Sequence, residues 1–279
     1  MKEHRLANRT KLSLHDRYGG HALVTGAARG IGRAFAEYLA ADGFDLLLVD
    51  HEAEENRALA HELHANHGID AQAILCDLSK DGLSEKAREW ATSNEIGLLV
   101  NNAGISPMDR FFDISLEDHL TTLDLNCRAT LILSHTIGRA MANRGRGALI
   151  IVSSASAISG AAYFSHYAAT KGYGLNLATS LWSELRGSGI DVLAVCPGLT
   201  NTTPVKERKL DQTVPFFVPM NDPEVVARGA LRALGRGPVV IPTFADRLSS
   251  SLMSRLLPRS WTLSLVRESM ERLRNSRNS

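Results

Sequence analysis

The sequence predicts one α/β domain whose core is a doubly wound parallel sheet. Short, continuous apolar runs alternate along the chain with longer amphipathic runs of helical period. The short runs are typical of parallel strands buried on both faces, and the alternation favours right-handed strand–helix–strand units. A glycine-rich turn joins the first apolar run to the first helical run, which is a second indication of this class. A single domain of this class accommodates the 279 residues.

The expected strands and helices follow one another in a regular order. Six apolar runs are expected to be strands, at Ala22–Val24, Leu46–Val49, Ala71–Cys76, Leu98–Val100, Leu149–Val152 and Val192–Val195. The expected helices cover Arg33–Ala41, Glu52–Asn66, Leu120–Ile137 and Ser165–Leu185. Cys76, Cys127 and Cys196 are odd in number and lie in apolar contexts, which predicts packed, reduced thiols in a cytoplasmic protein.

We expect three segments, namely a basic N-terminal extension over 1–20, the α/β domain over 21–242 and a basic amphipathic helical extension over 243–279. The net charge is +1, with +3 on residues 1–20 and +4 on residues 241–279, which leaves −6 on residues 21–240. The first residues lack the apolar core of a signal peptide, and no window approaches the roughly 18 apolar residues of a membrane span. A cytoplasmic location is therefore expected. Nucleic-acid binding is not expected, because the basic residues are terminal and not interleaved with stacking aromatics.

The C-terminal extension allows two interpretations. Leucines recur at helical spacing among arginines until Pro258, and a second amphipathic piece follows at Trp261–Leu273. A basic amphipathic stretch of this kind can lie on a membrane surface as a peripheral contact. The alternative is a lid or a subunit contact that packs on the protein itself. The leucines are Leu248, Leu252, Leu256 and Leu257.

A glycine turn after the first strand predicts a nucleotide site. The run His21–Thr25 is followed by glycines spaced Gly-x-x-x-Gly-x-Gly and then by a helical run. Glycines let the backbone approach a pyrophosphate, and the free N–H groups of the helix N-terminus favour the anion. An ordinary strand-to-helix loop is the alternative interpretation. The expected contact residues are Gly26, Arg29, Gly30, Ile31 and Gly32.

The end of the second strand predicts NAD rather than NADP. Asp50 lies where a carboxylate accepts hydrogen bonds from the adenosine ribose and repels a 2′-phosphate. Arg29 in the glycine turn favours NADP instead, because a basic side chain there could bind a 2′-phosphate. The alternative for Arg29 is a solvated loop arginine. His51 supplies no dependable positive charge at neutral pH.

Tyr167 and Lys171 lie four residues apart in an expected helix and so share one of its faces. A neighbouring cation lowers the pKa of a phenol, and a phenol tuned in this way can exchange a proton with an alcohol or a carbonyl. Taken alone, the pair could also be two solvated surface side chains. The nucleotide site upstream favours the catalytic interpretation.

Together these residues resemble the short-chain dehydrogenase/reductase family over about residues 20–242. The resemblance implies a seven-stranded Rossmann-type sheet and a homodimer or homotetramer formed through the helices that carry Asn126 and Tyr167. It also implies an adenine contact at Asp77 and Leu78, a proton-relay water anchored by Asn126, and a catalytic serine at Ser154. Further cofactor contacts are implied at Asn102, Ala103, Gly104, Pro197, Gly198 and Thr202.

The implied chemistry needs no metal. Ser154 would hydrogen-bond the carbonyl, Tyr167 would exchange its proton, and Lys171 would hold the nicotinamide ribose. Ser153 and Ser156 compete with Ser154, whose spacing to Tyr167 favours it. Tyr163 and Tyr173 lack a lysine four residues on and are expected in the pocket wall or the core. His61, His64 and His67 could chelate a metal, or form a solvated helix face.

The substrate is expected to be a lipophilic secondary alcohol or ketone. The entry Tyr18–Gly20 before the first strand and the run Leu256–Arg259 in the tail resemble a subgroup that contains hydroxysteroid dehydrogenases and 3-oxoacyl-CoA reductases. The chain departs from this subgroup at Asp50, where its mostly NADP-dependent members tend to carry a neutral residue. The loop Val214–Pro219, with Phe216 and Phe217, favours an apolar ligand, and core packing explains the two phenylalanines equally well. A polar polyol or sugar would need polar groups, for which Lys206, Glu207 and Arg208 are the candidates. An NAD-binding regulator without turnover is the remaining alternative.

Overall fold

The computed structural model describes residues 12–202 and 220–248, together with eight residues of the C-terminal segment, and every structural statement below concerns these. The eight are Pro258, Ser260, Trp261, Leu263, Ser264, Arg267, Glu268 and Glu271. Several predictions fall outside the described residues. These concern residues 1–11, the loop residues Lys206, Glu207, Arg208, Phe216 and Phe217, and the leucines Leu252, Leu256 and Leu257.

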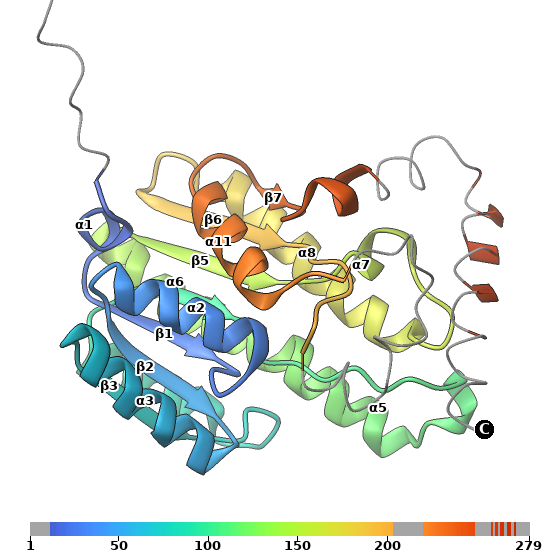
Figure 1. The fold of residues 1–279 in the computed structure, drawn as a ribbon, viewed down its shortest axis with the longest axis horizontal. Coiled ribbons are helices and arrows are strands. Elements are labelled where there is room, and N and C mark those ends of the chain that lie inside the picture. The colour runs from blue at the N-terminus through green and yellow to red at the C-terminus, as the bar shows by residue number, and fades with distance from the viewer. Residues whose placement is uncertain are drawn as a thin grey trace, which may run out of the picture.

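Seven parallel strands form one sheet in the order β3-β2-β1-β4-β5-β6-β7, which confirms the predicted doubly wound fold (Figure 1). The order reverses between β1 and β4, and ligands bind outside the carboxyl ends of the strands at such a switch point. The strands are β1 His21–Thr25, β2 Asp45–Asp50, β3 Ala71–Leu75, β4 Ile96–Asn101, β5 Gly147–Val152, β6 Ile190–Val195 and β7 Val239–Val240.

Helices cover both faces of the sheet, which explains why the strands are apolar without alternation. Ala22 and Val24 belong to a core under α2, α3 and α11, whereas Leu23 between them belongs to a second core under α4, α6 and α8. In Figure 1, α2 and α3 lie in front of the sheet. These helices are α2 Gly30–Ala41, α3 Ala53–His67, α4 Leu83–Ser93, α6 Ala129–Arg144, α8 Ser165–Glu184 and α11 Pro223–Ala233.

The expected helix over Leu120–Ile137 is not continuous. Helix α5, Leu116–Leu123, runs into a π-helical turn, η2, Asp124–Arg128, and α6 begins after it. Single π turns inside α-helices are rare and are frequent at functional sites. The remaining short elements are α1 Leu14–Tyr18, η1 Phe111–Asp113 and α7 Ser156–Ser159.

Part of the predicted N-terminal extension is docked on the domain. Ser13 and Asp16 form a capping box at the start of α1. The Tyr18 hydroxyl donates to Asp191 Oδ2 over 2.8 Å, and Arg17 pairs with the same carboxylate at 2.7 Å. No helix in the described part of the chain is long and apolar enough to cross a membrane.

Candidate active site

The glycine turn closes tightly against the end of β1. The Gly26 N–H donates to the Val49 carbonyl over 2.8 Å, and Gly26 has a φ of 64°, which favours glycine. A Cβ on Gly32 would lie 1.9 Å from the Gly26 oxygen, so no other residue fits there without backbone movement. The first turn of α2 therefore packs directly on the strand end.

The N-terminus of α2 has the properties of an anion site. Arg29 is its N-cap, and no side chain caps the helix, so the first N–H groups of Gly30, Ile31 and Gly32 are not taken by a cap. Unpaired N–H groups and the helix dipole both favour a negative charge at this point. A dinucleotide pyrophosphate fits this arrangement, because the close approach at Gly32 leaves backbone rather than side chains facing it.

Thr25 ties together the two strand ends at the switch point. Its hydroxyl donates to the Val100 carbonyl at 3.2 Å and accepts from the N–H groups of Asn102 and Ala103 at 2.9 and 3.0 Å. The Asn102 amide donates back to the carbonyls of Thr25 and Gly26 at 2.9 and 3.1 Å. Thr25 was expected only as the first residue of the glycine motif, and its contacts with the end of β4 are a finding of the structure.

Asp50 is buried, with only 7% of the residue exposed. Its carboxylate holds the backbone on two sides. Its Oδ2 accepts from the Ala28 N–H at 2.9 Å and its Oδ1 from the Glu52 N–H at 3.0 Å, while His51 Nδ1 lies 3.1 Å from Oδ1. The carboxylate thus fixes the glycine turn relative to the start of α3.

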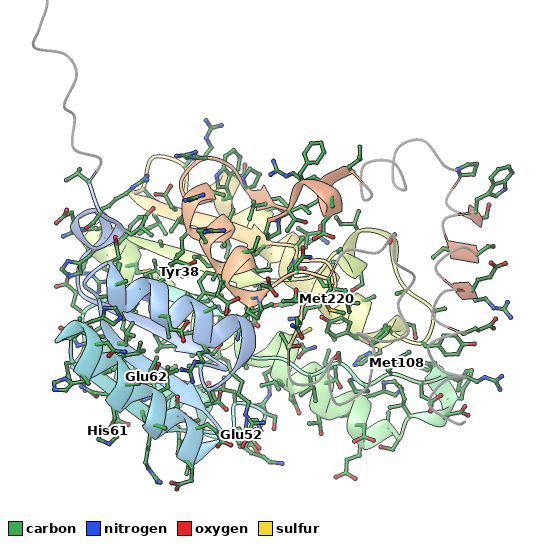
Figure 2. All side chains as sticks on the ribbon, viewed as in Figure 1. Tyr38, Glu52, His61, Glu62, Met108 and Met220 are labelled. Atoms are coloured by element: carbon green, nitrogen blue, oxygen red, sulfur yellow. The ribbon has the colours of Figure 1, made fainter. Side chains whose placement is uncertain are left out.

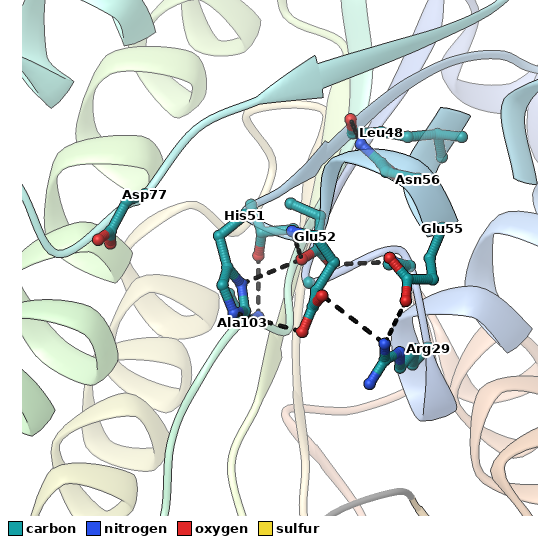
Figure 3. Close-up of polar contacts among 12 residues, drawn as sticks. Arg29, Leu48, His51, Glu52, Glu55, Asn56, Asp77 and Ala103 are labelled. Carbon is teal, nitrogen blue, oxygen red and sulfur yellow. Dashed lines mark hydrogen bonds and ion pairs between the residues drawn. The ribbon is translucent and has the colours of Figure 1, made fainter. Parts of the chain in front are cut away.

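Asp77 lies on the loop after β3, and in Figure 3 it stands on the other side of His51 from Arg29. Its Oδ1 accepts from the Ser79 N–H at 2.9 Å and from the Ser79 hydroxyl at 2.7 Å. Partial burial raises the pKa of Asp77, but the Ser79 hydrogen bonds outweigh it and hold the pKa below its usual value. Leu78 is buried in the core under α4.

Asn126 lies inside the π turn and is buried. Its Oδ1 accepts from the Ile105 N–H at 3.0 Å, and its Nδ2 donates to the Ile105 carbonyl at 3.0 Å and to Thr170 Oγ1 at 2.9 Å. A Cβ on Gly104 would lie 2.9 Å from Asn126 Oδ1 and 3.2 Å from Lys171 Nζ. The three elements that carry Gly104, Asn126 and Lys171 therefore converge.

Lys171 is buried beside Tyr167 in α8, with 8% of the residue exposed. Its Nζ donates to the Val152 carbonyl at 2.9 Å and lies 5.8 Å from the centroid of the Tyr167 ring. Burial lowers the pKa of Lys171 to about 8. The Tyr167 side chain is half-buried and also meets the Phe164 ring edge-on at 5.9 Å.

The two neighbouring serines point in different directions. The Ser153 hydroxyl is buried and donates to the Lys171 carbonyl at 2.7 Å, so it links β5 to α8. The half-buried Ser154 Oγ accepts from the N–H and hydroxyl of Ser156 at 3.2 and 3.0 Å. Ser154 is thus the serine of this pair that faces away from the packed interior.

The turn after β6 packs against the C-terminal segment. The Pro197 carbonyl accepts from the Ala155 N–H at 2.9 Å, and a Cβ on Gly198 would lie 2.3 Å from Asp246 Oδ1. Asp246 is buried and its Oδ2 accepts from Asn221 Nδ2 at 2.6 Å and from the Thr243 hydroxyl at 2.7 Å. Asp246 lies in the expected C-terminal extension, and no role was predicted for it.

Thr202 reaches the glycine turn. A Cβ on Gly30 would lie 3.0 Å from Thr202 Cγ2. A cavity of about 260 Å³ opens beside this contact and is lined largely by polar residues of α2 and of the start of α11. The glycine turn, the β6 turn and Thr202 therefore lie along one edge of the sheet.

The C-terminal segment reaches the wall of the site. The Tyr163 hydroxyl donates to Glu271 Oε1 at 2.9 Å, and Arg267 pairs with Glu271 at 3.0 Å. Leu263 Cδ2 would lie 3.9 Å from a Cβ on Gly160. In Figure 1 the described pieces of this segment lie at the right-hand side of the view, beyond α7.

His61, His64 and His67 are all exposed on α3, and Figure 2 shows His61 on the outer side of that helix. His64 Nδ1 lies 2.8 Å from the Ile69 carbonyl. Within the described ranges, no group of three or more histidine, cysteine or acidic side chains could hold a metal ion.

Comparison with known proteins places the chain in a family. Residues 20–213 match the family model for short chain dehydrogenases. The chain is 33% identical to a very-long-chain 3-oxoacyl-CoA reductase-like protein of Arabidopsis thaliana, over 89% of this chain and 82% of that protein. It is 29% identical to a 7β-hydroxysteroid dehydrogenase of Collinsella aerofaciens, over 68% of this chain and 73% of that protein.

A solved structure agrees with these relatives. The structure of a short-chain dehydrogenase from Sphingobium yanoikuyae in complex with NADPH superimposes with a TM-score of 0.73 at 30% identity, covering 85% of this chain and 96% of that chain. Sequence, fold and site geometry therefore lead to one conclusion. The chain belongs to the short-chain dehydrogenase/reductase family and is an NAD(P)-dependent oxidoreductase that acts on CH–OH groups.

Proposed function

We propose that this protein is an NAD-dependent dehydrogenase that interconverts a lipophilic secondary alcohol and its ketone. The observation that carries the proposal is that Tyr167, the buried Lys171 and Asn126 converge at the edge of the sheet where the glycine turn lies. A hydride transfer needs a proton donor or acceptor next to the nicotinamide, and this edge is where a dinucleotide binds in a doubly wound sheet.

The proton is handled by Tyr167 in this mechanism. In the oxidative direction, the Tyr167 phenolate removes the proton of the substrate hydroxyl, and the bound NAD supplies the acceptor for the hydride. The Ser154 hydroxyl hydrogen-bonds the substrate oxygen and orients it. In the reductive direction, Tyr167 donates its proton to the carbonyl oxygen while Ser154 holds the same oxygen in place.

Lys171 and Asn126 support Tyr167. The Lys171 ammonium lies near the phenol ring and favours the phenolate form by its charge. It would also hold the nicotinamide ribose hydroxyls of a bound cofactor. The Asn126 side chain fixes the π turn to Ile105 and Thr170, so this turn holds its shape beside Lys171 and can position a water that resupplies the proton.

The NAD preference rests on Asp50. Replacing it in Asp50→Ala removes a negative charge that repels a 2′-phosphate, so kcat/KM with NADP is expected to rise about tenfold relative to NAD. Steady-state kinetics with both cofactors measure this ratio. Asp45→Ala is the matched control, because Asp45 lies at the opposite end of β2 and accepts from the Asp70 N–H. An unchanged ratio in Asp50→Ala would show that another group discriminates.

A lipophilic substrate is supported by the apolar surface around the site and by the relatives. Ile105 is exposed on the loop after β4, Phe111 in η1 and Ile158 in α7, which follows β5. Two of the similar proteins bear names of enzymes for long acyl chains and steroids. The test is NADH absorbance with a panel of steroids, hydroxyacyl thioesters, aromatic carbinols and polyols. Turnover confined to polyols would contradict the proposal.

The C-terminal segment is proposed to be a lid on the substrate side rather than a membrane contact. Tyr163 has a φ of 65°, a left-handed conformation that costs a bulky residue about 1–2 kcal/mol, and its hydroxyl is held by Glu271. The Tyr163–Glu271 hydrogen bond and the approach of Leu263 to Gly160 hold the segment against the site, and they offset the cost of the Tyr163 backbone.

Loss of that hydrogen bond should loosen the lid. We expect Tyr163→Phe and Glu271→Gln each to raise KM for the substrate about threefold to tenfold, with KM for NAD unchanged. Glu268→Gln serves as the control, because Glu268 is an exposed acid of the same segment. Equal effects in all three variants would leave the lid without support.

A further inference from the structure

Arg29 is held by two acidic residues at the adenosine end of the site. Its guanidinium lies 3.6 Å from Glu52 Oε2 and hydrogen-bonds Glu55 Oε1, as Figure 3 shows. Glu52 is the N-cap of α3 and Glu55 lies in its first turn. The three side chains are 37–43% exposed, so the contacts form on the open rim of the site.

The geometry of this rim is set from below by Asp50. One oxygen of the buried carboxylate accepts from the N–H of Ala28, next to Arg29, and the other accepts from the N–H of Glu52. Asp50 therefore anchors the backbone on both sides of the ion pairs. Arg29 and the two glutamates face one another because the same carboxylate holds their chain segments.

The Glu55 side chain is stabilised in its charged carboxylate form. Its pKa is lowered first by a backbone hydrogen bond at the start of α3 and then by the Arg29 side chain. A first-turn acid on α3 is also favoured by the helix dipole. Arg29 thus faces, at Glu55, a carboxylate that remains charged near neutral pH.

This arrangement changes what Arg29 can do. A guanidinium next to the glycine turn is a good partner for a ribose 2′-phosphate, because it forms strong charge-assisted hydrogen bonds with phosphate oxygens. Here the guanidinium is already shared between two carboxylates, and a 2′-phosphate would have to displace them. The phosphate would also add negative charge next to the carboxylates of Glu52 and Glu55, which is unfavourable.

We propose that Glu52 and Glu55 are specificity-determining residues that exclude NADP by engaging the Arg29 guanidinium. The inference rests on the proposed NAD preference and assigns part of it to residues beyond Asp50. NAD is distinguished from NADP by competition, because Glu52 and Glu55 bind the same Arg29 guanidinium that a 2′-phosphate would bind.

The test measures binding rather than turnover. Dissociation constants for NAD and NADP are measured by isothermal titration calorimetry on the full chain and on the double variant Glu52→Gln, Glu55→Gln. We expect the double variant to bind NADP roughly tenfold tighter than the wild type, and NAD within about twofold of it. Glu54→Gln is the matched control, because Glu54 lies in the same helical turn and pairs with Arg57 instead.

A third substitution separates release of Arg29 from simple loss of negative charge. Adding Arg29→Gln to the double variant should reverse the gain in NADP affinity if the freed guanidinium binds the phosphate. A gain that persists in this triple variant, or no gain in the double variant, overturns the inference. A wild-type protein that binds NADP as tightly as NAD would instead contradict the proposed cofactor, so the two failures are distinguishable.

Discussion

Replacing Tyr167 with phenylalanine is expected to lower kcat by about 10³-fold, because the change removes the group that exchanges the substrate proton. The aromatic ring remains, so its contacts with Phe164 and Lys171 are preserved and the fold should not change. We expect the dissociation constant for NAD to stay within about twofold of the wild-type value, since the phenol is one of many cofactor contacts. Single-turnover kinetics and calorimetry measure the two quantities.

The same helix provides a control for this variant. Tyr173 lies in α8 and is partly exposed, and it has no lysine four residues further on. Tyr173→Phe is therefore expected to keep wild-type kcat. Substantial turnover in Tyr167→Phe would contradict the assignment of the proton to this residue. Loss of NAD binding in the same variant would instead assign Tyr167 to the binding of the cofactor.

Removing the Lys171 ammonium is expected to stabilise the cofactor-free protein while lowering its activity. In Lys171→Met, kcat should fall on the order of 10²-fold or more, because no cation remains to favour the phenolate or to hold the ribose. At pH 7, the melting temperature of the cofactor-free variant should exceed that of the wild type. The lower kcat and the higher melting temperature have one cause, because the charge that supports catalysis is buried at a cost to stability.

The pH dependence follows from the lowered pKa. Lys171 has a pKa of about 8 in the folded protein against 10.5 in the unfolded chain, so between these values the unfolded state binds more protons. As the pH rises from about 8 to about 10.5, the contribution of Lys171 therefore raises the free energy of unfolding of the wild type by roughly 3 kcal/mol. Below pH 8 the full cost of burying the ammonium is present. The excess stability of Lys171→Met should be largest at pH 7 and shrink towards pH 10. An excess that does not vary with pH would contradict a buried ammonium.

The sheet was predictable from the sequence because its strands are defined locally. Each apolar run in the sequence corresponds to a strand, and the ends differ by one or two residues, as for Ala71–Leu75. The added strand β7 is only two residues long, Val239–Val240, and gives no periodic signal. Local pattern suffices where burial on both faces alone decides the structure.

The break between α5 and α6 could not be predicted in this way. The π turn preserves the apolar pattern of a helix, so the periodicity of the sequence does not reveal it. The Asn126 side chain bonds to Ile105 and to Thr170, which lie on other elements. A sequence pattern carries no information about such a partner.

The acidic partners of Arg29 were missed for a similar reason. The partner expected for Arg29 was either a 2′-phosphate or solvent, and the structure places it in ion pairs with Glu52 and Glu55. The two acids lie at the start of α3, and they approach Arg29 because β1 and β2 are neighbours in the sheet. The roles of the predicted catalytic and cofactor residues stay predictions, although the structure brings Asn126 and Lys171 together at Gly104.

The most direct test of the account follows the hydride itself. The secondary alcohol that turns over best in the substrate panel is prepared with deuterium on its carbinol carbon and incubated with the wild-type protein and NAD. Mass spectrometry of the reduced nucleotide then shows where the deuterium goes. The account predicts that NADH carries the deuterium and that Tyr167→Phe forms almost none of it. Unlabelled NADH, or tight binding of NAD without turnover of any alcohol in the panel, would contradict it.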